Sequence, residues 1–452
     1  MPTIAARTPL HHESRWLRRA AVAAALLAPA ALLGAVIAIG LRGNDVPGWA
    51  VLAGGLCLLG TLALAVARYD TAVALGFVTF GFVRVEPAPA DAIFAVIIAV
   101  AIVTGRMNLR TTPAGPALAI SAFLALNLIA CLEAVDPGRA ALFMGVTVYL
   151  CAFALWVPSW VNTREHARTL LRIYVGVAVV SAALGSLALF VAFPFHDQFT
   201  YFTGTRARGL FRDPNVFGPF LIPAAMMLTQ ELLEPRLLRS GRLLKIAMLG
   251  ALACGILFSY SRGAWLNYAV AIVTMGAVLA LRRGGGGRAL LFLGVLLVGA
   301  VAVVASIQFT GQLDFLQERA QFQSYDNQRF GAQSGGIELA ERNPIGIGPG
   351  QFELAAPISA HSTYVRALAE QGVLGFMVIV ALLYGTLLMA LRNAAKGWDT
   401  YGIGSAALFA SWCGILANSI FVDTLHWRHL WLVAGLIWAA QASSSAGTRP
   451  LR

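Results

Sequence analysis

Long apolar runs recur along the whole chain and determine its predicted architecture. A membrane-spanning helix needs about 20 largely uncharged residues, and the first two such runs are residues 20–41 and 49–67. Further runs lie at residues 71–83, 92–104, 116–132, 140–160, 169–193, 215–230, 243–258, 264–281, 289–309, 372–391, 402–420 and 430–440. The pair 71–83 and 92–104 is short, as is 430–440, which leaves room for one re-entrant or merged pair. The pattern predicts an all-α, polytopic membrane protein with about 12 to 14 transmembrane helices.

The composition excludes a water-soluble globule. Of the 452 residues, 58% are apolar and only 12% are charged, and the mean hydropathy is +0.74. So much apolar surface needs a bilayer as its solvent. The first apolar run is longer than that of a secretory signal and lacks a convincing small-residue cleavage site, so we expect an uncleaved first span.

The basic residues predict the orientation of the spans, because short loops rich in Lys and Arg stay on the cytoplasmic side. With the N-terminus inside, roughly two thirds of the Lys and Arg lie in cytoplasmic segments, and an even number of spans returns both termini to that side. The net charge of +12 then reports topology and indicates no nucleic-acid partner. The five cysteines all lie in apolar runs, so we expect no disulfide, no metal site and no cofactor.

Two connections predicted to face outward are long enough to form a site, residues 194–214 and residues 310–371. In the second, Leu313–Gln323 has helix-like spacing, and RNPIGIGPG, Arg342–Gly350, is a break rich in Gly and Pro before another short helix. We therefore expect a structured cap. The predicted division is a transmembrane bundle at 1–309, the cap at 310–371 and C-terminal spans at 372–452.

The first polar cluster is RARGLFRDPN, Arg206–Asn215, which places three arginines directly before an apolar run. A guanidinium presents a planar fork of donors and stays protonated, so arginines suit the two phosphates of a diphosphate better than lysines do. The alternative is snorkelling to the membrane interface or binding of lipid headgroups. The candidate ligands are Arg206, Arg208 and Asn215, with Arg212 as a secondary candidate.

The second cluster is SYSRGAW, Ser259–Trp265, in which Arg262 occupies a short connection between two apolar runs. An arginine placed deeper in the bilayer would cost several kcal/mol unless it were paired. Arg262 is therefore either a topology marker or the far wall of an anion site. Gly263 would let a ligand approach the backbone closely.

The third cluster is AHSTYVRALAEQGVLG, Ala360–Gly375, with His361 at the start of a short predicted helix on which His361, Tyr364 and Leu368 share one face. The dipole near a helix N-terminus favours a neutral imidazole, which can accept a proton. The alternative is an ordinary hydrogen-bonded loop histidine. Glu370 is a secondary candidate as base or orienting group, although it is spaced to form an ion pair with Arg366 on the helix surface.

In this order the three clusters resemble the O-antigen ligase and O-antigen polymerase superfamily of bacterial inner-membrane glycosyltransferases. The resemblance covers about residues 200–376 at the level of motifs. Two departures from the family pattern are that Arg208 and Arg212 lie off it and that Ser362 stands where many members have Asn. The matching positions are Arg206, Gly209, Phe211, Pro214, Asn215, Ser261, Arg262, Gly263, Asn343, Pro344, His361, Tyr364, Glu370, Gly372 and Gly375, with Tyr364 a secondary site candidate.

The resemblance implies a GT-C-like fold and a transfer that needs neither a metal nor a nucleotide sugar. The donor would be a glycan on polyprenyl diphosphate, and the acceptor either lipid A core, for a ligase, or another lipid-linked glycan, for a polymerase. Inversion at the anomeric carbon on the periplasmic face is expected, among membrane lipids. Arg206 and Arg262 would stabilise the leaving diphosphate, and His361 would activate or orient the acceptor hydroxyl.

Two other classes of protein compete with this interpretation. A transporter of a small anion or a glycolipid should place ionisable residues at helix midpoints, whereas those of this chain lie at segment ends. A non-catalytic envelope scaffold would use the same outward loops as an interface, but it gives no reason for arginines on two separate connections. We therefore favour the glycosyltransferase.

Overall fold

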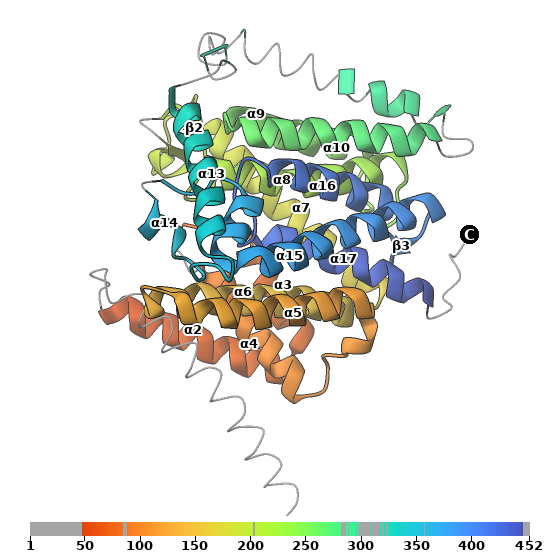
Figure 1. Cartoon of the computed structure of the whole chain (residues 1–452). Coiled ribbons are helices and arrows are strands. Elements are labelled where there is room, and N and C mark those ends of the chain that lie inside the picture. Colours follow the sequence, from red (N-terminus) through yellow and green to blue (C-terminus); the bar gives the residue numbers. More distant parts are fainter. Residues whose placement is uncertain are drawn as a thin grey trace, which may run out of the picture. The chain divides into compact units, whose positions relative to one another are not determined.

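The structure, a computed structural model, describes residues 48–84, 88–201, 204–281, 324–356 and 358–445, with short pieces between 286 and 321. The predicted span at 20–41 lies outside these residues, as do most of the predicted span at 289–309 and most of the helix-like stretch at 313–323. The described chain is almost entirely helical (Figure 1).

Helices cover the predicted spans that lie within the described residues. They are α2 Gly48–Ala67, α3 Tyr69–Thr79, α4 Pro89–Val103, α5 Ala114–Ala130, α6 Pro137–Trp160, α7 Arg164–Leu187, α8 Pro214–Leu233, α9 Arg242–Phe258, α10 Arg262–Leu281, α13 Ser324–Arg342, α14 Phe352–Ala355, α15 Thr363–Lys396, α16 Ser405–Asn418 and α17 Arg428–Ser445. Six of them, α5, α6, α7, α8, α10 and α15, are long and apolar enough to cross a membrane. The predicted all-α, polytopic membrane class is confirmed.

Two short antiparallel ribbons accompany the helices. Strand β1, Thr200–Tyr201, pairs with β2, Arg206–Ala207, and β3, Asp399–Thr400, pairs with β4, Ile403–Gly404. Three single 3₁₀ turns lie at Leu109–Thr111, Cys131–Glu133 and His196–Phe199. The first ribbon holds the start of the RARGLFRDPN cluster.

The chain divides into two compact units, residues 1–73 with 91–107, and residues 74–90 with 108–452. The first contains α2 and α4, and there the Tyr69 hydroxyl donates to the Ile97 carbonyl at 3.4 Å. The second contains every predicted site residue. Helices α3 and α4 have 11 and 15 residues, so neither reaches the length of about 20 that crosses a bilayer alone.

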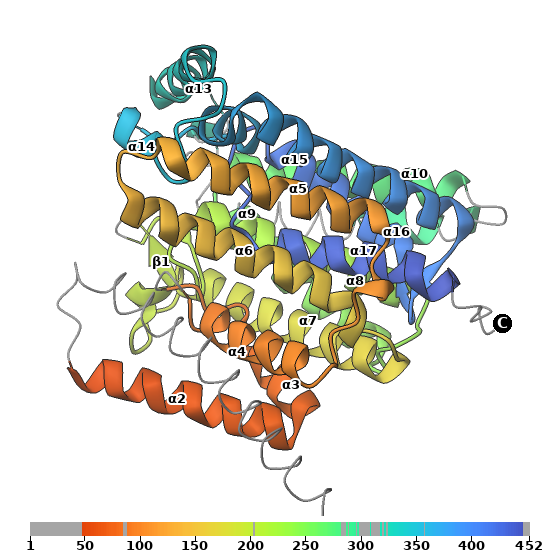
Figure 2. The ribbon, with the colours of Figure 1, turned by 60° about the horizontal axis from the view of Figure 1, so that its bottom comes forward.

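Helix α8 is the most enclosed helix among the candidate spans of the second unit. Within its apolar stretch 89% of the residues are buried, and it packs against α7, α9, α10 and α16 (Figure 2). It begins with Pro214 at its first turn, and the Asp213 side chain accepts the Asn215 N–H at 2.8 Å as an N-cap. Because Pro fixes φ and a cap satisfies a free amide, the DPN sequence starts this helix sharply.

Helices α10 and α16 interlock through glycine and asparagine. A Cβ added to Gly263 would lie 2.5 Å from Asn418 Oδ1, and one added to Gly414 would overlap Asn267. Each helix therefore places a glycine against the asparagine of the other. This close approach holds the SYSRGAW turn beside the C-terminal end of α16, as expected for small residues at helix interfaces in a membrane.

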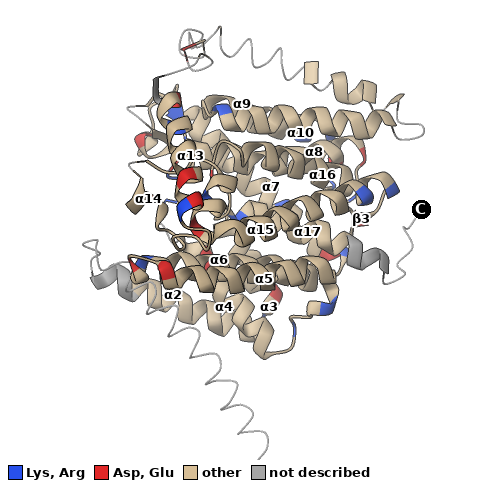
Figure 3. Ribbon diagram, in the orientation of Figure 1, with Lys and Arg blue, Asp and Glu red and all other residues tan. Residues whose placement is uncertain are grey.

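The connections of the second unit gather at its two ends. At one end, which we call the site end, Val83 N donates to the Leu210 carbonyl at 3.0 Å. The site end comprises the connections after α3, α5, α7, α9, α14 and α16, together with α13. At the opposite end Arg236 pairs with Asp399 at 2.8 Å. Figure 3 shows charged residues at the helix ends and on α13, with few along α10 or α16.

The RNPIGIGPG stretch forms a tight turn inserted at a kink in α15. Gly372, at φ 70, interrupts the helical backbone and separates a short head, residues 363–371, from the apolar length of the helix. In the turn, Ile347 N donates to the Ala369 carbonyl at 2.9 Å. The three glycines have φ values that other residues rarely adopt, and a Cβ on any of them would meet neighbouring atoms. They are Gly346, Gly348 and Gly350.

Helix α13 was not expected from the sequence. It crosses the site end and packs against α15 (Figures 1 and 2). Its sequence, SYDNQRFGAQSGGIELAER, is polar and contains three glycines, so neither apolar periodicity nor helix propensity points to it. Helix α13 is the longest helix in the described part of the predicted cap.

Candidate functional site

Arg206 joins the first motif to the second. It lies in β2 and is only 7% exposed. Its Nε donates to the Ser259 carbonyl at 2.8 Å, in the turn that precedes Arg262, and a terminal nitrogen donates to Asn215 Oδ1 at 3.1 Å. Two of the predicted diphosphate ligands, Arg206 and Asn215, are thus held together at the N-terminus of α8. That terminus adds the favourable dipole for an anion.

Arg262 begins α10 and is held by a carboxylate of α13. Its two terminal nitrogens form a bidentate pair with Asp326, one of them at 2.9 Å from Oδ2, and Asp326 is only 5% exposed. Bidentate arginine–carboxylate pairs are among the stronger protein hydrogen bonds. A diphosphate that binds Arg262 must therefore compete with Asp326.

His361 lies immediately before α15 and not on it. Ser362 is the N-cap of that helix, and His361 has a left-handed backbone with φ 46. The predicted shared helical face with Tyr364 and Leu368 is therefore wrong. The helix begins two residues later because the Ser362 hydroxyl accepts the N–H of Val365 at 3.4 Å.

The environment of His361 favours a neutral imidazole. Burial lowers its pKa below the usual histidine value of 6.5, and the positive charge of Arg329 lowers it further, while Asp213 and Asp423 act in the opposite direction. Its carbonyl accepts a hydrogen bond from Gln333 of α13 at 3.2 Å. At neutral pH His361 can thus accept a proton, the property expected from the sequence, although burial and Arg329 cause it.

The three sequence clusters meet at the site end. Arg206 links the first to the second, α13 links the second to the third through Asp326 and Gln333, and Asp213 of the first cluster acts electrostatically on His361.

Residues 247–380 match the O-antigen ligase family. This match supports the O-antigen ligase and polymerase superfamily for that part of the chain. The matched stretch runs from α9 into α15 and contains Arg262 and His361, whereas Arg206 and Asn215 precede it. No curated protein matches the chain significantly. The matched family is glycosyltransferase-like, which supports an enzyme of this general kind.

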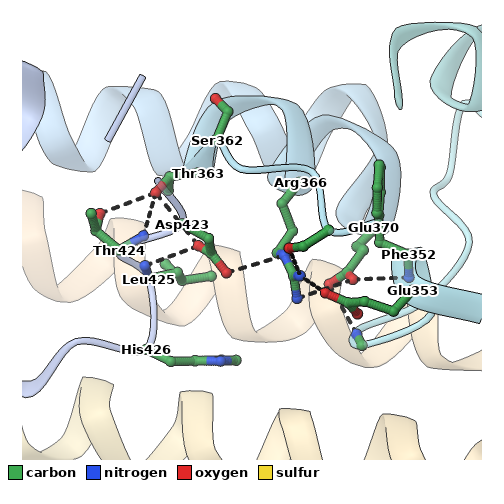
Figure 4. A network of polar contacts seen from close by, with 12 residues as sticks. Phe352, Glu353, Ser362, Thr363, Arg366, Glu370, Asp423, Thr424, Leu425 and His426 are labelled. Atoms are coloured by element: carbon green, nitrogen blue, oxygen red, sulfur yellow. Dashed lines mark hydrogen bonds and ion pairs between the residues drawn. The ribbon is translucent and has the colours of Figure 1, made fainter. Parts of the chain in front are cut away.

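Within the O-antigen ligase match, Glu370 braces the glycine turn. Its carboxylate accepts the backbone N–H groups of Gly350 at 2.9 Å and Phe352 at 3.1 Å, and its side chain is 2% exposed (Figure 4). The ion pair with Arg366, 3.6 Å away, is buried and not on the helix surface. These contacts give Glu370 a supporting position and leave His361 as the better candidate base.

Arg366 is the centre of a buried polar network that the sequence analysis did not single out. Its guanidinium contacts Glu353, donates to Ser359 Oγ at 3.0 Å, and pairs with Asp423 at 3.1 Å (Figure 4). Asp423 comes from the connection after α16, so this network ties that connection to the head of α15. The sequence signal for this network was Asp423, an acidic residue in a short polar connection.

The remaining predicted site residues, Tyr364, Arg208 and Arg212, make other contacts. The Tyr364 hydroxyl donates to the Leu416 carbonyl of α16 at 3.4 Å. Arg208 donates to the Arg212 carbonyl at 3.4 Å and lies over the Tyr201 ring, on a different part of the loop from the guanidinium of Arg206. The RARGLFRDPN arginines therefore form two groups, with Arg206 in one and Arg208 and Arg212 in the other.

Proposed function

We propose that the protein is a bacterial inner-membrane glycosyltransferase that moves a glycan from polyprenyl diphosphate to an acceptor sugar hydroxyl, as an O-antigen ligase acting on lipid A core. The observation that carries this proposal is the Arg206–Ser259 contact, which brings one arginine to the turn that bears the other, at the end where neutral His361 lies. Two arginines from separate connections suit a diphosphate better than a single charge.

In the proposed reaction, the acceptor oxygen attacks the anomeric carbon as the bond to the diphosphate oxygen breaks. The electron pair of that bond leaves with the diphosphate, and the proton of the acceptor hydroxyl passes to His361. Arg206 and Arg262 stabilise the charge that grows on the leaving group, and each charge-assisted hydrogen bond contributes about 1.5 to 3 kcal/mol. Attack from the face opposite the leaving group inverts the anomeric centre.

The distribution of basic residues supports a periplasmic site end. Connections and helix ends at the opposite end carry Arg164, Arg236 and Lys396 among other basic residues, as the cytoplasmic side of a membrane protein does. The lipid-linked donor would enter from the membrane beneath α13.

Polymerisation of lipid-linked repeat units is the alternative within the superfamily, because the same site would accept a second lipid-linked glycan. Transport is the alternative of another class. It would require ionisable groups midway along the helices, whereas the buried pair Lys245–Glu231 lies near helix termini at the opposite end. That position favours a structural role for this pair.

The test is transfer by the purified chain in lipid, with EDTA, from a polyprenyl-diphosphate glycan to lipid A core or to the same lipid-linked unit. We expect metal-independent transfer that is lost in Arg206→Ala, Arg262→Ala and His361→Ala, and the productive acceptor distinguishes ligase from polymerase. Arg172→Ala, an exposed arginine of α7, is the matched control. Full activity in all three site variants would refute the proposal.

A further inference from the structure

A cavity at the site end has one arginine, Arg212, in its lining, and two more arginines, Arg84 and Arg208, lie next to the lining residues Val83 and Tyr201. The cavity has a volume of 360 Å³ and is lined by Val83, Tyr201, Phe211, Arg212, Asp213 and Val216. Arg84 follows Val83 in the connection after α3, and its positive charge interacts with that of Arg208. The volume falls in the range of small-molecule sites.

Aromatic rings and loose hydrogen bonds hold two of these arginines. Arg84 lies 5.7 Å over the Phe199 ring and Arg208 lies 5.7 Å over the Tyr201 ring. Arg84 donates to the Gly209 carbonyl at 3.3 Å, and Arg208 to the Arg212 carbonyl at 3.4 Å. Charge-assisted hydrogen bonds are usually about 2.7 to 2.9 Å long. These longer bonds therefore hold the two guanidinium groups in place only weakly.

The charge of the cluster is not balanced within the described part of the chain. There, none of Arg84, Arg208 and Arg212 forms an ion pair with a carboxylate, and the Nε of Arg208 is buried without a hydrogen-bond partner. Asp213 lines the cavity and caps α8, so one negative charge stands against the three arginines and leaves a net positive charge. Burial and the charge of Arg208 lower the pKa of Arg84. A buried unsatisfied donor beside like charges is costly unless an anion binds.

We propose that Arg84, Arg208 and Arg212 form a second phosphate-binding site, separate from Arg206 and Arg262, that takes a phosphate carried by a lipid-borne molecule. The guanidinium of Arg206 is directed to Ser259 and Asn215, away from this cluster. Val83, Phe211 and Val216 give the cavity apolar walls beside its charge. That combination suits a phosphate attached to a larger amphipathic molecule.

This inference rests on the proposed function for its first source of phosphate, the acceptor glycolipid. A transferase that joins two lipid-borne molecules must hold both at once, and a second anion site beside the leaving-group site would orient the acceptor. A phospholipid headgroup is the other source of the same chemistry. Replacing Arg84 would change the KM for the acceptor if the phosphate is on the acceptor, and the retention of phospholipid if it is a headgroup.

The kinetic test compares wild type with Arg84→Gln, using a phosphorylated core glycolipid and the same glycolipid after phosphatase treatment. If the phosphate belongs to the acceptor, Arg84→Gln raises KM for the phosphorylated acceptor about tenfold, as expected for one lost charge-assisted bond. The KM for the dephosphorylated acceptor stays unchanged. Arg84→Lys, which keeps the charge, should recover part of the affinity, and Arg172→Gln is the matched control.

Two binding measurements make the site testable without turnover. In the Arg262→Ala background, inorganic pyrophosphate should bind about tenfold more weakly after Arg84→Gln. Native mass spectrometry from nanodiscs containing phosphatidylglycerol should show loss of a retained phospholipid if the headgroup is the source. Absence of transfer by wild type would overturn the proposed function only. Unchanged acceptor KM, pyrophosphate affinity and lipid retention in Arg84→Gln would overturn the second site.

Discussion

Replacing Asp326 by Asn should tighten binding of the lipid-linked donor. In the structure this carboxylate holds both terminal nitrogens of Arg262, the arginine proposed to receive the diphosphate. Asparagine keeps the size and one acceptor oxygen but removes the charge and the second acceptor. The donor would then displace a neutral partner in place of a bidentate ion pair.

The magnitude follows from the bond that is lost. One charge-assisted hydrogen bond contributes about 1.5 to 3 kcal/mol, and 1.4 kcal/mol corresponds to about a tenfold change in an equilibrium constant. We therefore expect the donor KM of Asp326→Asn to fall about tenfold or more. The KM for the acceptor should change little, because Asp326 contacts the donor arginine.

The assay is steady-state transfer with donor and acceptor varied separately, alongside binding of inorganic pyrophosphate. Glu338→Gln is a matched control, since Glu338 pairs with Arg342 on the same helix but both side chains are exposed. A donor KM that rises in Asp326→Asn would refute the reasoning and would mean that Asp326 orients Arg262 for the diphosphate. An unchanged KM would mean that Arg262 does not bind the donor.

Three further predictions concern the histidine, its support and the glycine turn. Because the folded pKa of His361 is lowered below 6.5, transfer measured against pH should begin to fall only below that value, as His361 gains a proton. The same shift makes His361 reduce folding stability as pH falls through the unfolded pKa, and His361→Gln should remove that dependence in thermal unfolding. Glu370→Gln should destabilise the fold by about 1 to 3 kcal/mol, because its hydrogen bonds to Gly350 and Phe352 weaken. The pH profile of the residual transfer should keep its shape. A shifted profile would instead make Glu370 a base. Gly346→Ala should lower Tm and activity together, because φ is 97 and its Cβ would overlap the Glu370 carbonyl, whereas Gly286→Ala, with open space around it, should change neither.

The sequence predicted the positions of the apolar helices in the described part of the chain, but the contacts of the site only partly. Apolar length is a local property, so the helices that fill the bilayer could be located by reading along the chain. Helix α13 could not, because its polar sequence is stabilised by packing at the site end and not by an apolar face. Asp326, which it carries, has no motif around it. Its role depends on an arginine 64 positions away in sequence.

The same limit explains the arginines. Arg206 and Arg208 are two residues apart and were treated as one cluster, yet one side chain turns to Ser259 and the other to the Tyr201 ring. Gly209, with φ 52, redirects the chain directly after them. Arg84 joined the second group through a contact that spans 125 positions. The sequence identified arginines suited to bind an anion in this loop, but not that their side chains form two separate groups.

The two halves of the proposed site are supported in different ways, and this difference has a mechanistic consequence. His361 adjoins the head of α15, which the glycine turn, Glu370 and the Arg366–Asp423 pair fix from three separate segments. Arg262 is tied to α13 by an ion pair that an anion can exchange. If the donor displaces Asp326 from Arg262, the contact between α10 and α13 changes, and Gln333 of α13, which donates to the His361 carbonyl, links that change to the histidine. In the proposed mechanism, the bracing of the α15 head would limit how far such a change moves His361, and so would help to keep it preorganised for the acceptor hydroxyl.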